Sequence, residues 1–418
     1  MVAGTLTNGL AYLVPMLGAR RLPADELGAL ATALALITIA SVAGTGLQTA
    51  VAVHRARQPH ASTARVAHAT TAVSGGVLLA AAPLIVTTLH LPVGVVALLV
   101  AMTLAVVLAA RWLGELQGDQ RFLRLAVGMS VLAVGRYGGV IAGLALGAGL
   151  VGSLAAGVLC GYLALPLLRL LARAGAATPG AGAGVPGGAP ALGVRRVLTA
   201  SNATLAMLVV SYADLILARQ LLPPAESGAY SVGTVLTKGA LWAPQVVTVL
   251  ALPRMARAGS TTRTTALAVV AACGVALVAG SALAGGLAFR LAGGPDYTTL
   301  GGYAPYFAAT GALYAVAFVL INAQIATGAR WPSVPLWTAA GGLVVVTVFV
   351  APHTFAGIMW SALAAAAVAA LVLAVLVHAP GRARHGDGPE QTATVAAVGV
   401  GRGRPDRQPS RRNSTELT

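Results

Sequence analysis

Apolar runs of about 20 residues recur along almost the whole chain, and they limit it to a narrow set of folds. A helical run of this length matches the roughly 30 Å hydrocarbon core of a bilayer. Only 9% of the 418 residues are charged and 57% are hydrophobic, whereas a soluble domain carries about 25% charged residues. Continuous runs also argue against a membrane barrel, whose strands alternate in polarity. The sequence therefore predicts an all-α, polytopic membrane protein.

Twelve such runs can be separated, and they divide the chain into two halves. The expected spans are 2–19, 27–53, 66–89, 93–113, 122–147, 150–171, and then 197–218, 227–252, 264–289, 302–325, 334–350 and 355–377. The composition between and after the spans predicts a flexible cytoplasmic linker and a disordered basic cytoplasmic tail. We thus expect an N-terminal six-helix lobe (1–172), the linker (173–195), a C-terminal six-helix lobe (196–378) and the tail (379–418).

A short motif near the start of each half indicates that the halves are related. Residues 22–29 read LPADELGA and residues 222–229 read LPPAESGA, and an Ala-Arg pair lies just before each copy. Each half is then expected to begin with a helix, this hairpin and a second helix. Six spans is an even number, so both halves enter the membrane in the same orientation. A pseudo-twofold axis along the membrane normal is expected to relate them.

The arginines predict the orientation, because cytoplasmic loops carry the excess of positive charge. With both termini in the cytoplasm, the outer connections hold only Arg20, Arg21, Arg219 and Arg290. The inner connections then hold Arg55, Arg57, Arg65, Arg111, Arg121, Arg124, Arg169, Arg173, Arg195, Arg196, Arg254, Arg257, Arg263 and Arg330. This distribution explains the net charge of +16 as a record of topology, and we expect no nucleic-acid partner.

Nothing in the sequence indicates catalysis. There is no nucleophile elbow, no P-loop and no HExxH motif. The two cysteines, Cys160 and Cys273, are far apart and lie in apolar runs, so they form neither a disulfide framework nor a metal site. We therefore expect no enzymatic activity, no bound metal and no cofactor.

Ionisable groups inside spans are the candidates for a binding site, because each costs at least about 2.5–3.5 kcal/mol in hydrocarbon. Arg136 and Lys238 are expected near the midplane, one in each half. Cations from both lobes suit an anionic substrate, such as a phosphate or an acidic sugar. The structural alternative is that one of them pairs with Asp214 or caps the carbonyls of a broken helix. Asp214 itself either reaches the cavity or has a structural role nearer the outer face. The amides of Gln245 and Asn322 fit a hydroxyl-rich ligand, and equally contacts between helices.

Three stretches resemble polysaccharide flippases of the multidrug/oligosaccharidyl-lipid/polysaccharide exporter superfamily. The first is Tyr212 to Gly233, with its acid and its L-P-x-x-E-x-G-x-Y hairpin, followed by Lys238. Residues 113–122, LGELQGDQRF, resemble the QG-x-x-RF turn after the fourth span of that family. Residues 293–297, GGPDY, and 325–328, IATG, resemble its glycine–tyrosine loop and the end of its tenth span. The resemblance covers about residues 1–378.

The resemblance implies two six-helix bundles that form a V and work by alternating access. It also implies a substrate, a polyprenyl-pyrophosphate-linked oligosaccharide moved from the inner to the outer leaflet of a bacterial plasma membrane. Arg136 and Lys238 match the cationic cavity residues that receive this anion. Membrane lipids, a polysaccharide polymerase and glycosyltransferases are the expected partners.

Three other functions remain open at this point. A multidrug antiporter of the same superfamily needs membrane-embedded carboxylates, of which Asp214 is the one candidate. A peptidoglycan-precursor flippase is a second alternative, although its relatives usually carry two extra spans. The third is a membrane scaffold for glycosyltransferases that transports nothing, and the two cations near the midplane argue against it.

Overall fold

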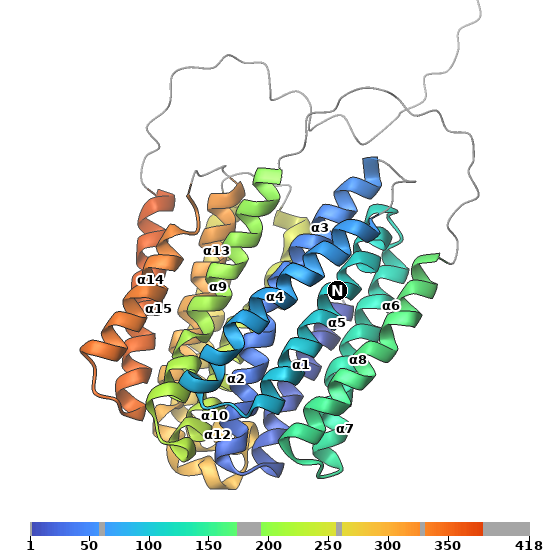
Figure 1. Cartoon of the computed structure of the whole chain (residues 1–418). Coiled ribbons are helices and arrows are strands. Elements are labelled where there is room, and N and C mark those ends of the chain that lie inside the picture. The colour runs from blue at the N-terminus through green and yellow to red at the C-terminus, as the bar shows by residue number, and fades with distance from the viewer. Residues whose placement is uncertain (1, 58–62, 174–193, 256–260, 327–330, 379–418) are drawn as a thin grey trace, which may run out of the picture. The chain divides into compact units, whose positions relative to one another are not determined.

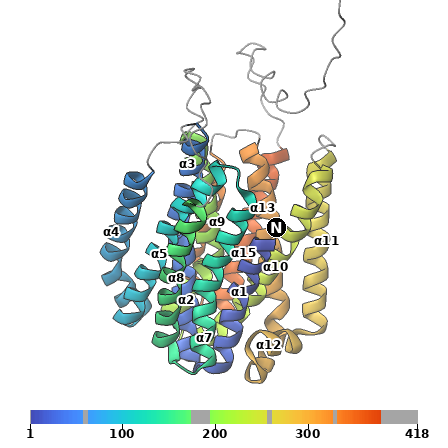
Figure 2. The ribbon, with the colours of Figure 1, turned by 90° about the vertical axis from the view of Figure 1, so that its right-hand side faces the viewer.

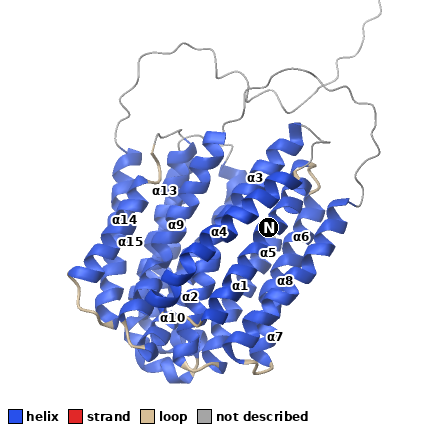
Figure 3. Ribbon diagram, viewed as in Figure 1, coloured by secondary structure: helices blue, strands red, loops and turns tan. Residues whose placement is uncertain are grey.

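The structure is a computed structural model that describes residues 2–57, 63–173, 194–255, 261–326 and 331–378. Within these ranges the structure does not describe the side chains of 2, 56–57, 194–200, 243–255, 261–263, 266, 325–326 and 378. The described chain is helical, with short connections (Figure 3). Residues 1–378 group into one compact unit. Most of the expected linker and the whole expected tail lie outside the described residues.

The first half of the chain forms six rods. Two of them are composite: α2 continues into α3 past a break at Ser41, and α6 continues through a π-helical turn, η1, into α7. The elements are α1 (Val2–Arg21), α2 (Ala24–Ala40), α3 (Val42–Arg57), α4 (Ala64–Leu89), α5 (Val93–Gly118), α6 (Phe122–Ala133), η1 (Val134–Gly138), α7 (Gly139–Ala145) and α8 (Gly149–Arg173).

The second half also forms six rods, which stand beside the first (Figures 1 and 2). Its elements are α9 (Val194–Leu221), α10 (Pro224–Met255), α11 (Thr261–Leu283), α12 (Gly285–Gly293), η2 (Pro295–Tyr303), α13 (Ala304–Ala326), α14 (Val334–Phe349) and α15 (Phe355–His378).

One predicted span differs from the structure. The sequence predicts one span over 264–289, but α11 and α12 are bent by 94° to each other. The bend lets α12 pack against η2 at glycines. A Cβ on Gly285 would collide with the carbonyl oxygen of Gly301, and a Cβ on Gly301 would lie 2.5 Å from the nitrogen of Gly286. The last residues of the expected span therefore form α12, which bends away from α11 and packs against the backbone of η2.

The helices are suited to a membrane. Eight segments of the described chain are long and apolar enough to cross a bilayer, and nine if the bent α11–α12 pair counts as one span. The shorter α14, together with α1 and α10, completes six rods in each half. The predicted fold, an all-α polytopic membrane protein of two six-helix bundles, is confirmed.

The two copies of the repeated motif fold alike. Leu22 and Leu222 are both buried, and each is followed by a proline that precedes the next helix. The amide of Leu27 donates to the carbonyl of Pro23 at 2.9 Å, and the amide of Ser227 donates to Pro223 at the same distance. We call the end of the bundle that carries these turns, residues 21–26 and 221–226, the hairpin end. The opposite end, where α8 ends and α9 begins, is the linker end.

The two halves meet in backbone contact at the hairpin end. A Cβ on Gly228 of α10 would collide with the carbonyl oxygen of Ala24 in α2. A Cβ on Gly28 of α2 would lie 3.1 Å from the Ser227 hydroxyl and 3.3 Å from the nitrogen of Gly228. Glycine permits helices in a membrane to approach this closely. The Gly28–Gly228 crossing therefore closes the hairpin end between the halves.

Two arginines extend this contact on either side of the crossing. Arg219 of α9 donates from Nε to the carbonyl of Leu89 at 3.2 Å and from Nη1 to that of Asp25 at 3.2 Å. Its Nη2 reaches the carbonyl of His90, at the end of α4, at 3.4 Å. Arg20 of α1 donates to the carbonyl of Leu291, near the end of α12, at 3.5 Å. A cation is favourable at a helix C-terminus, so each half holds a helix end of the other.

Substituting Gly228 with alanine is predicted to open the hairpin end. The added methyl group cannot fit against Ala24, so α2 and α10 must separate there. Spin labels at Asp25→Cys and Ala225→Cys, with Cys160 and Cys273 replaced by serine, report the distance. We expect the Gly228→Ala protein to shift to longer distances. The matched control is Gly76→Ala in α4, where a Cβ meets nothing within 4 Å; equal distance distributions for the two variants would contradict the closure.

Candidate functional site

A small cavity lies between the two halves, beyond the Gly28–Gly228 crossing as seen from the hairpin end. Its volume is about 150 Å³, and it is lined by residues of α1, α2, η1, α9 and α10. We call it the central cavity. Elements of both halves build it, so it lies where relative movement of the halves would open and close it.

The lining of the central cavity follows the internal repeat. Four positions of α2 and the four positions of α10 that lie 200 residues later face it: Ala31, Leu34, Ala35 and Thr38, and Ser231, Thr234, Val235 and Lys238. Tyr12 of α1 and Tyr212 of α9 line it with the same spacing. The pseudo-twofold axis thus runs through the cavity. The halves differ in chemistry, because Thr38 stands where the second half has Lys238.

Lys238 is held at the cavity wall by polar and aromatic contacts. Its side chain is 8% exposed, and its ammonium group donates to the carbonyl of Ser211. The same nitrogen lies 3.4 Å from the centre of the Tyr212 ring, a geometry in which the ring attracts the cation. Tyr12 donates from its hydroxyl to the carbonyl of Lys238 at 2.6 Å. This bond links α1 of the first half directly to α10 of the second.

Arg136 approaches the same region from the first half. Its guanidinium carbon lies 4.2 Å from the ring centre of Tyr137, which lines the central cavity, and it interacts electrostatically with Tyr212. Its Nε is buried and has no hydrogen-bond partner among the described residues. Arg136 stands next to the lining rather than in it. A buried, unsatisfied donor is costly, so this side chain is suited to an acceptor that the described chain does not supply.

The π-helical turn that carries Arg136 is held against α8 by glycines. A Cβ on Gly135 would lie 2.8 Å from the carbonyl oxygen of Cys160, and one on Gly139 would lie 2.5 Å from that of Ala156. Single π-turns inside α-helices occur frequently at functional sites. Here the extra residue in the turn sets the direction in which Arg136 and Tyr137 leave the helix.

Asp214 lies in the interior of the second half and is not among the residues that line the cavity. It is 2% exposed and accepts a hydrogen bond from the Tyr230 hydroxyl at 3.2 Å. It forms no ion pair with Lys238 or any other described residue. Tyr230 packs edge-on against Phe307 and Phe355, with ring centres 5.2 and 5.3 Å away. These contacts favour the structural role for Asp214.

The two candidate amides, Gln245 and Asn322, lie on α10 and α13. The side chain of Gln245 lies outside the described residues. Asn322 is exposed on α13, and its amide donates to the carbonyl of Phe318 in the same helix at 2.7 Å. It does not line the central cavity.

The aromatic part of the site was not predicted from the sequence. Tyr12, Tyr137 and Tyr212 line the cavity together with Trp242. The 200-residue spacing of the motif, applied to the flanking helices, pairs Tyr12 with Tyr212 and Thr38 with Lys238 and was the signal available. Tyr137 had no signal of its own apart from its place beside Arg136.

The chemistry of the central cavity is that of a cationic, aromatic site. Among the described residues that line it Lys238 is charged, and none is acidic. Hydroxyl groups of Thr38, Ser231 and Thr234 lie on the same walls. Such a site offers hydrogen-bond donors and positive charge to an anionic group.

Solved structures with a similar fold were found, but no match by sequence. No protein-family model matches the sequence, and no curated protein matches it. The lipid II flippase MurJ in an inward closed conformation has a similar structure, with a TM-score of 0.64 at 11% identity, covering 90% of this chain and 86% of that chain. An inward-facing multidrug resistance MATE family transporter of the MOP superfamily gives 0.54 at 15% identity, covering 89% and 94%. An outward-facing MATE structure gives 0.53 at 17% identity, covering 90% and 92%.

The chain has the fold of the MOP superfamily transporters. At these identities the similarity concerns the fold alone. The similar structures are transporters and not enzymes, and they include both a lipid flippase and multidrug transporters. The protein is a multi-pass membrane protein with a transporter fold.

Removing the hydroxyl of Tyr230 is predicted to destabilise the protein through the loss of one buried hydrogen bond. Tyr230→Phe leaves the buried Asp214 carboxyl without this donor, at a cost of about 1–3 kcal/mol. Asp214→Asn keeps an oxygen that can accept the bond, so it should cost less. Thermal unfolding of the purified variants measures both effects. If Asp214→Asn abolishes the activity of the protein while its melting temperature stays near that of the unchanged protein, the structural role is wrong.

Proposed function

We propose that this protein is a flippase for a polyprenyl-pyrophosphate-linked oligosaccharide. It moves the lipid-linked glycan from the inner to the outer leaflet of a bacterial plasma membrane by alternating access, in polysaccharide biosynthesis. A polymerase and glycosyltransferases act on the same lipid-linked glycan and are the partners this proposal implies. Both termini lie in the cytoplasm in the proposed orientation.

The observation that carries the proposal is the cationic centre between the halves. Lys238 comes from the second half and Arg136 from the first, and a buried donor of Arg136 has no partner among the described residues. A pyrophosphate carries negative charge and several strong acceptors, and it matches this pair. The hydroxyl-bearing lining suits the first sugars that follow the pyrophosphate.

The closed hairpin end supports alternating access. The Gly28–Gly228 crossing and the carbonyl contacts of Arg219 hold the halves together there. In the proposed orientation this end faces the outside, so the described state is closed to the outside. Transport then requires these contacts to break while contacts at the linker end form, with substrate between the cations.

A multidrug antiporter is the second candidate. The aromatic lining, with Tyr12, Tyr137, Tyr212 and Trp242, is suited to a flat organic cation as well as to a sugar. Against this candidate, Asp214 is satisfied by Tyr230 and lies outside the lining. An antiporter for cations therefore has no carboxylate available at the described cavity wall.

Neutralising either central cation is predicted to reduce flipping of the lipid-linked glycan. Lys238→Gln and Arg136→Gln each remove a charge from the pyrophosphate site, and we expect a loss of at least tenfold, equivalent to about 1.4 kcal/mol. The assay is translocation of polyprenyl-pyrophosphate oligosaccharide in proteoliposomes that hold equal amounts of each variant. Arg290→Gln is the control, because this arginine is exposed on α12 away from the cavity. If both variants flip the glycan as fast as the control, neither cation binds the pyrophosphate.

Deleting the gene separates the two candidate functions. The flippase proposal expects lipid-linked oligosaccharide to accumulate in the inner leaflet and surface polysaccharide to be lost. The antiporter candidate expects normal polysaccharide and an increased sensitivity to cationic drugs. Normal export together with unchanged lipid-linked intermediates overturns the proposed substrate.

A further inference from the structure

Two adjoining hollows lie on the outside of the first half, away from the central cavity. One is an apolar groove of about 660 Å³ between α6 and α8, with Ala3 of α1 at its edge. The other is a hollow of about 530 Å³ at the start of α6, lined by residues 120–124. Leu123 lines both, so the two are continuous. Together they run from the linker end of the bundle toward its middle.

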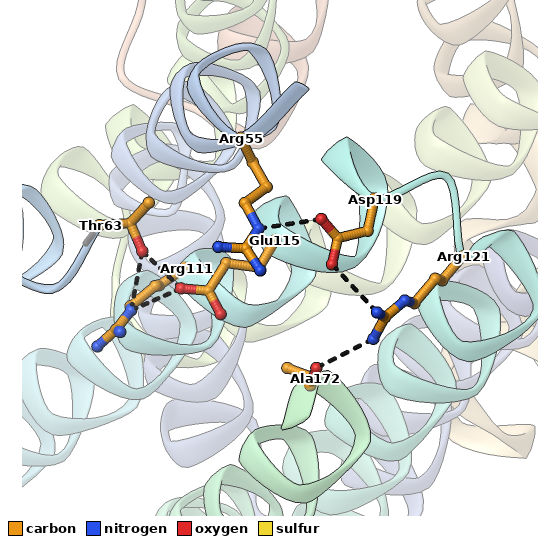
Figure 4. Close-up of polar contacts among 7 residues, drawn as sticks. All are labelled: Arg55, Thr63, Arg111, Glu115, Asp119, Arg121 and Ala172. Carbon is orange, nitrogen blue, oxygen red and sulfur yellow. Dashed lines mark hydrogen bonds and ion pairs between the residues drawn. The ribbon is translucent and has the colours of Figure 1, made fainter. Parts of the chain in front are cut away.

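The hollow at the start of α6 presents an unsatisfied arginine. Arg121 is engaged: it lies 3.6 Å from the Asp119 carboxylate and donates to the carbonyl of Ala172 at 3.3 Å, as Figure 4 shows. Asp119 also binds Arg55 at 3.0 Å. Arg124, one turn further along α6, lines the same hollow as Arg121. Its Nη1 is buried and has no hydrogen-bond partner among the described residues, so the hollow combines positive charge with a donor that lacks an acceptor.

The groove has the length and surface of an acyl-chain site. Its walls are apolar side chains such as Val127, Val134 and Leu163, which are 43%, 51% and 65% exposed. From Leu123 to Val134 the groove follows α6 for about 17 Å at 1.5 Å per residue. One leaflet of the hydrocarbon core is about 15 Å thick. The groove thus spans one leaflet, with the arginine at the level where head groups lie.

We propose that this surface binds an anionic phospholipid of the leaflet at the linker end. The phosphate of the head group accepts from Arg124, and one acyl chain lies in the groove between α6 and α8. Charge complementarity selects an anionic lipid over a neutral one, and the length of the groove fits one acyl chain of ordinary length. By the arginine distribution this is the cytoplasmic leaflet. The far end of the groove reaches Gly135, the residue before Arg136.

The test measures lipid binding to the full-length purified protein, and it does not depend on the transported substrate. Native mass spectrometry during titration with phosphatidylglycerol or phosphatidylcholine gives the affinity for each lipid. Arg124→Gln is expected to weaken phosphatidylglycerol binding about fivefold, which is the effect of one arginine near an anionic surface. Phosphatidylcholine has the same phosphate but also a choline cation that offsets its charge, so its binding should weaken less than that of phosphatidylglycerol. Arg124→Lys should restore part of the preference. Ser130→Trp fills the groove and should weaken binding of both lipids.

Arg65→Gln is the matched control, since Arg65 is exposed at the same end of the bundle, at the start of α4, and lines neither hollow. Equal phosphatidylglycerol affinities of Arg124→Gln and Arg65→Gln would overturn the proposal. So would tight binding of glycerol phosphate, which lacks acyl chains, or displacement of phosphatidylglycerol by equimolar polyprenyl phosphate, which would assign the groove to the transported lipid. A variant that loses its monodisperse elution is replaced by Ala126→Phe, which fills the same groove.

Discussion

The contact of α2 with α10 at Gly28 and Gly228 is the constraint on which the arrangement of the two halves depends. Backbone atoms meet there, with the carbonyl of Ala24 in the place that a Cβ of residue 228 would take. Because the two helices touch at equivalent glycines, the residues one to three turns further along each helix face each other across the same axis. Thr38 and Lys238 are the last such pair at the cavity. The crossing therefore closes the hairpin end and determines which side chains of α2 and α10 face the central cavity.

The repeat is symmetric in its backbone and asymmetric in its charges. Both copies make the same turn, yet the first half presents Thr38 where the second presents Lys238, and buried Val14 stands where the second has Asp214. The first half supplies its cation from a π-helical turn instead. Because the two halves place different charges around the axis, the proposed site is asymmetric although its backbone is not. The unequal placement of the two cations fits a group with a distinct lipid side and sugar side.

Much of the fold could be predicted from the sequence, because a membrane span needs a long apolar run and leaves its arginines in the connections. The twelve expected runs correspond to the twelve rods, and the LPxxExGA repeat identified the matching hairpins. The bend between α11 and α12 could not be predicted, because it depends on a backbone contact between Gly285 and Gly301, which belong to two different elements. The break at Ser41 had no turn signal in an otherwise apolar segment.

The sequence marks the charged candidates for a site but not the side chains that surround them. Arg136 and Lys238 stood out because ionisable groups are rare in spans. Lys238 lines the central cavity and Arg136 lies beside Tyr137 of the lining, and substrate binding by either residue stays a prediction. The location of Asp214 was beyond the sequence, since the side of a buried helix that a residue faces depends on packing with Tyr230 and its neighbours. Tyrosines do not stand out in an apolar chain, and only the 200-residue spacing marks Tyr12 and Tyr212 as partners.

The most direct test of the account is an experimental structure of the protein in lipid nanodiscs with bound polyprenyl pyrophosphate. The account predicts density for the pyrophosphate between α1, α2, η1, α9 and α10, within hydrogen-bond reach of Lys238 and Arg136. The Lys238 ammonium should then have left the carbonyl of Ser211. Pyrophosphate density elsewhere, with Lys238 still bound to Ser211 and the Arg136 Nε still unpartnered, would contradict the central claim.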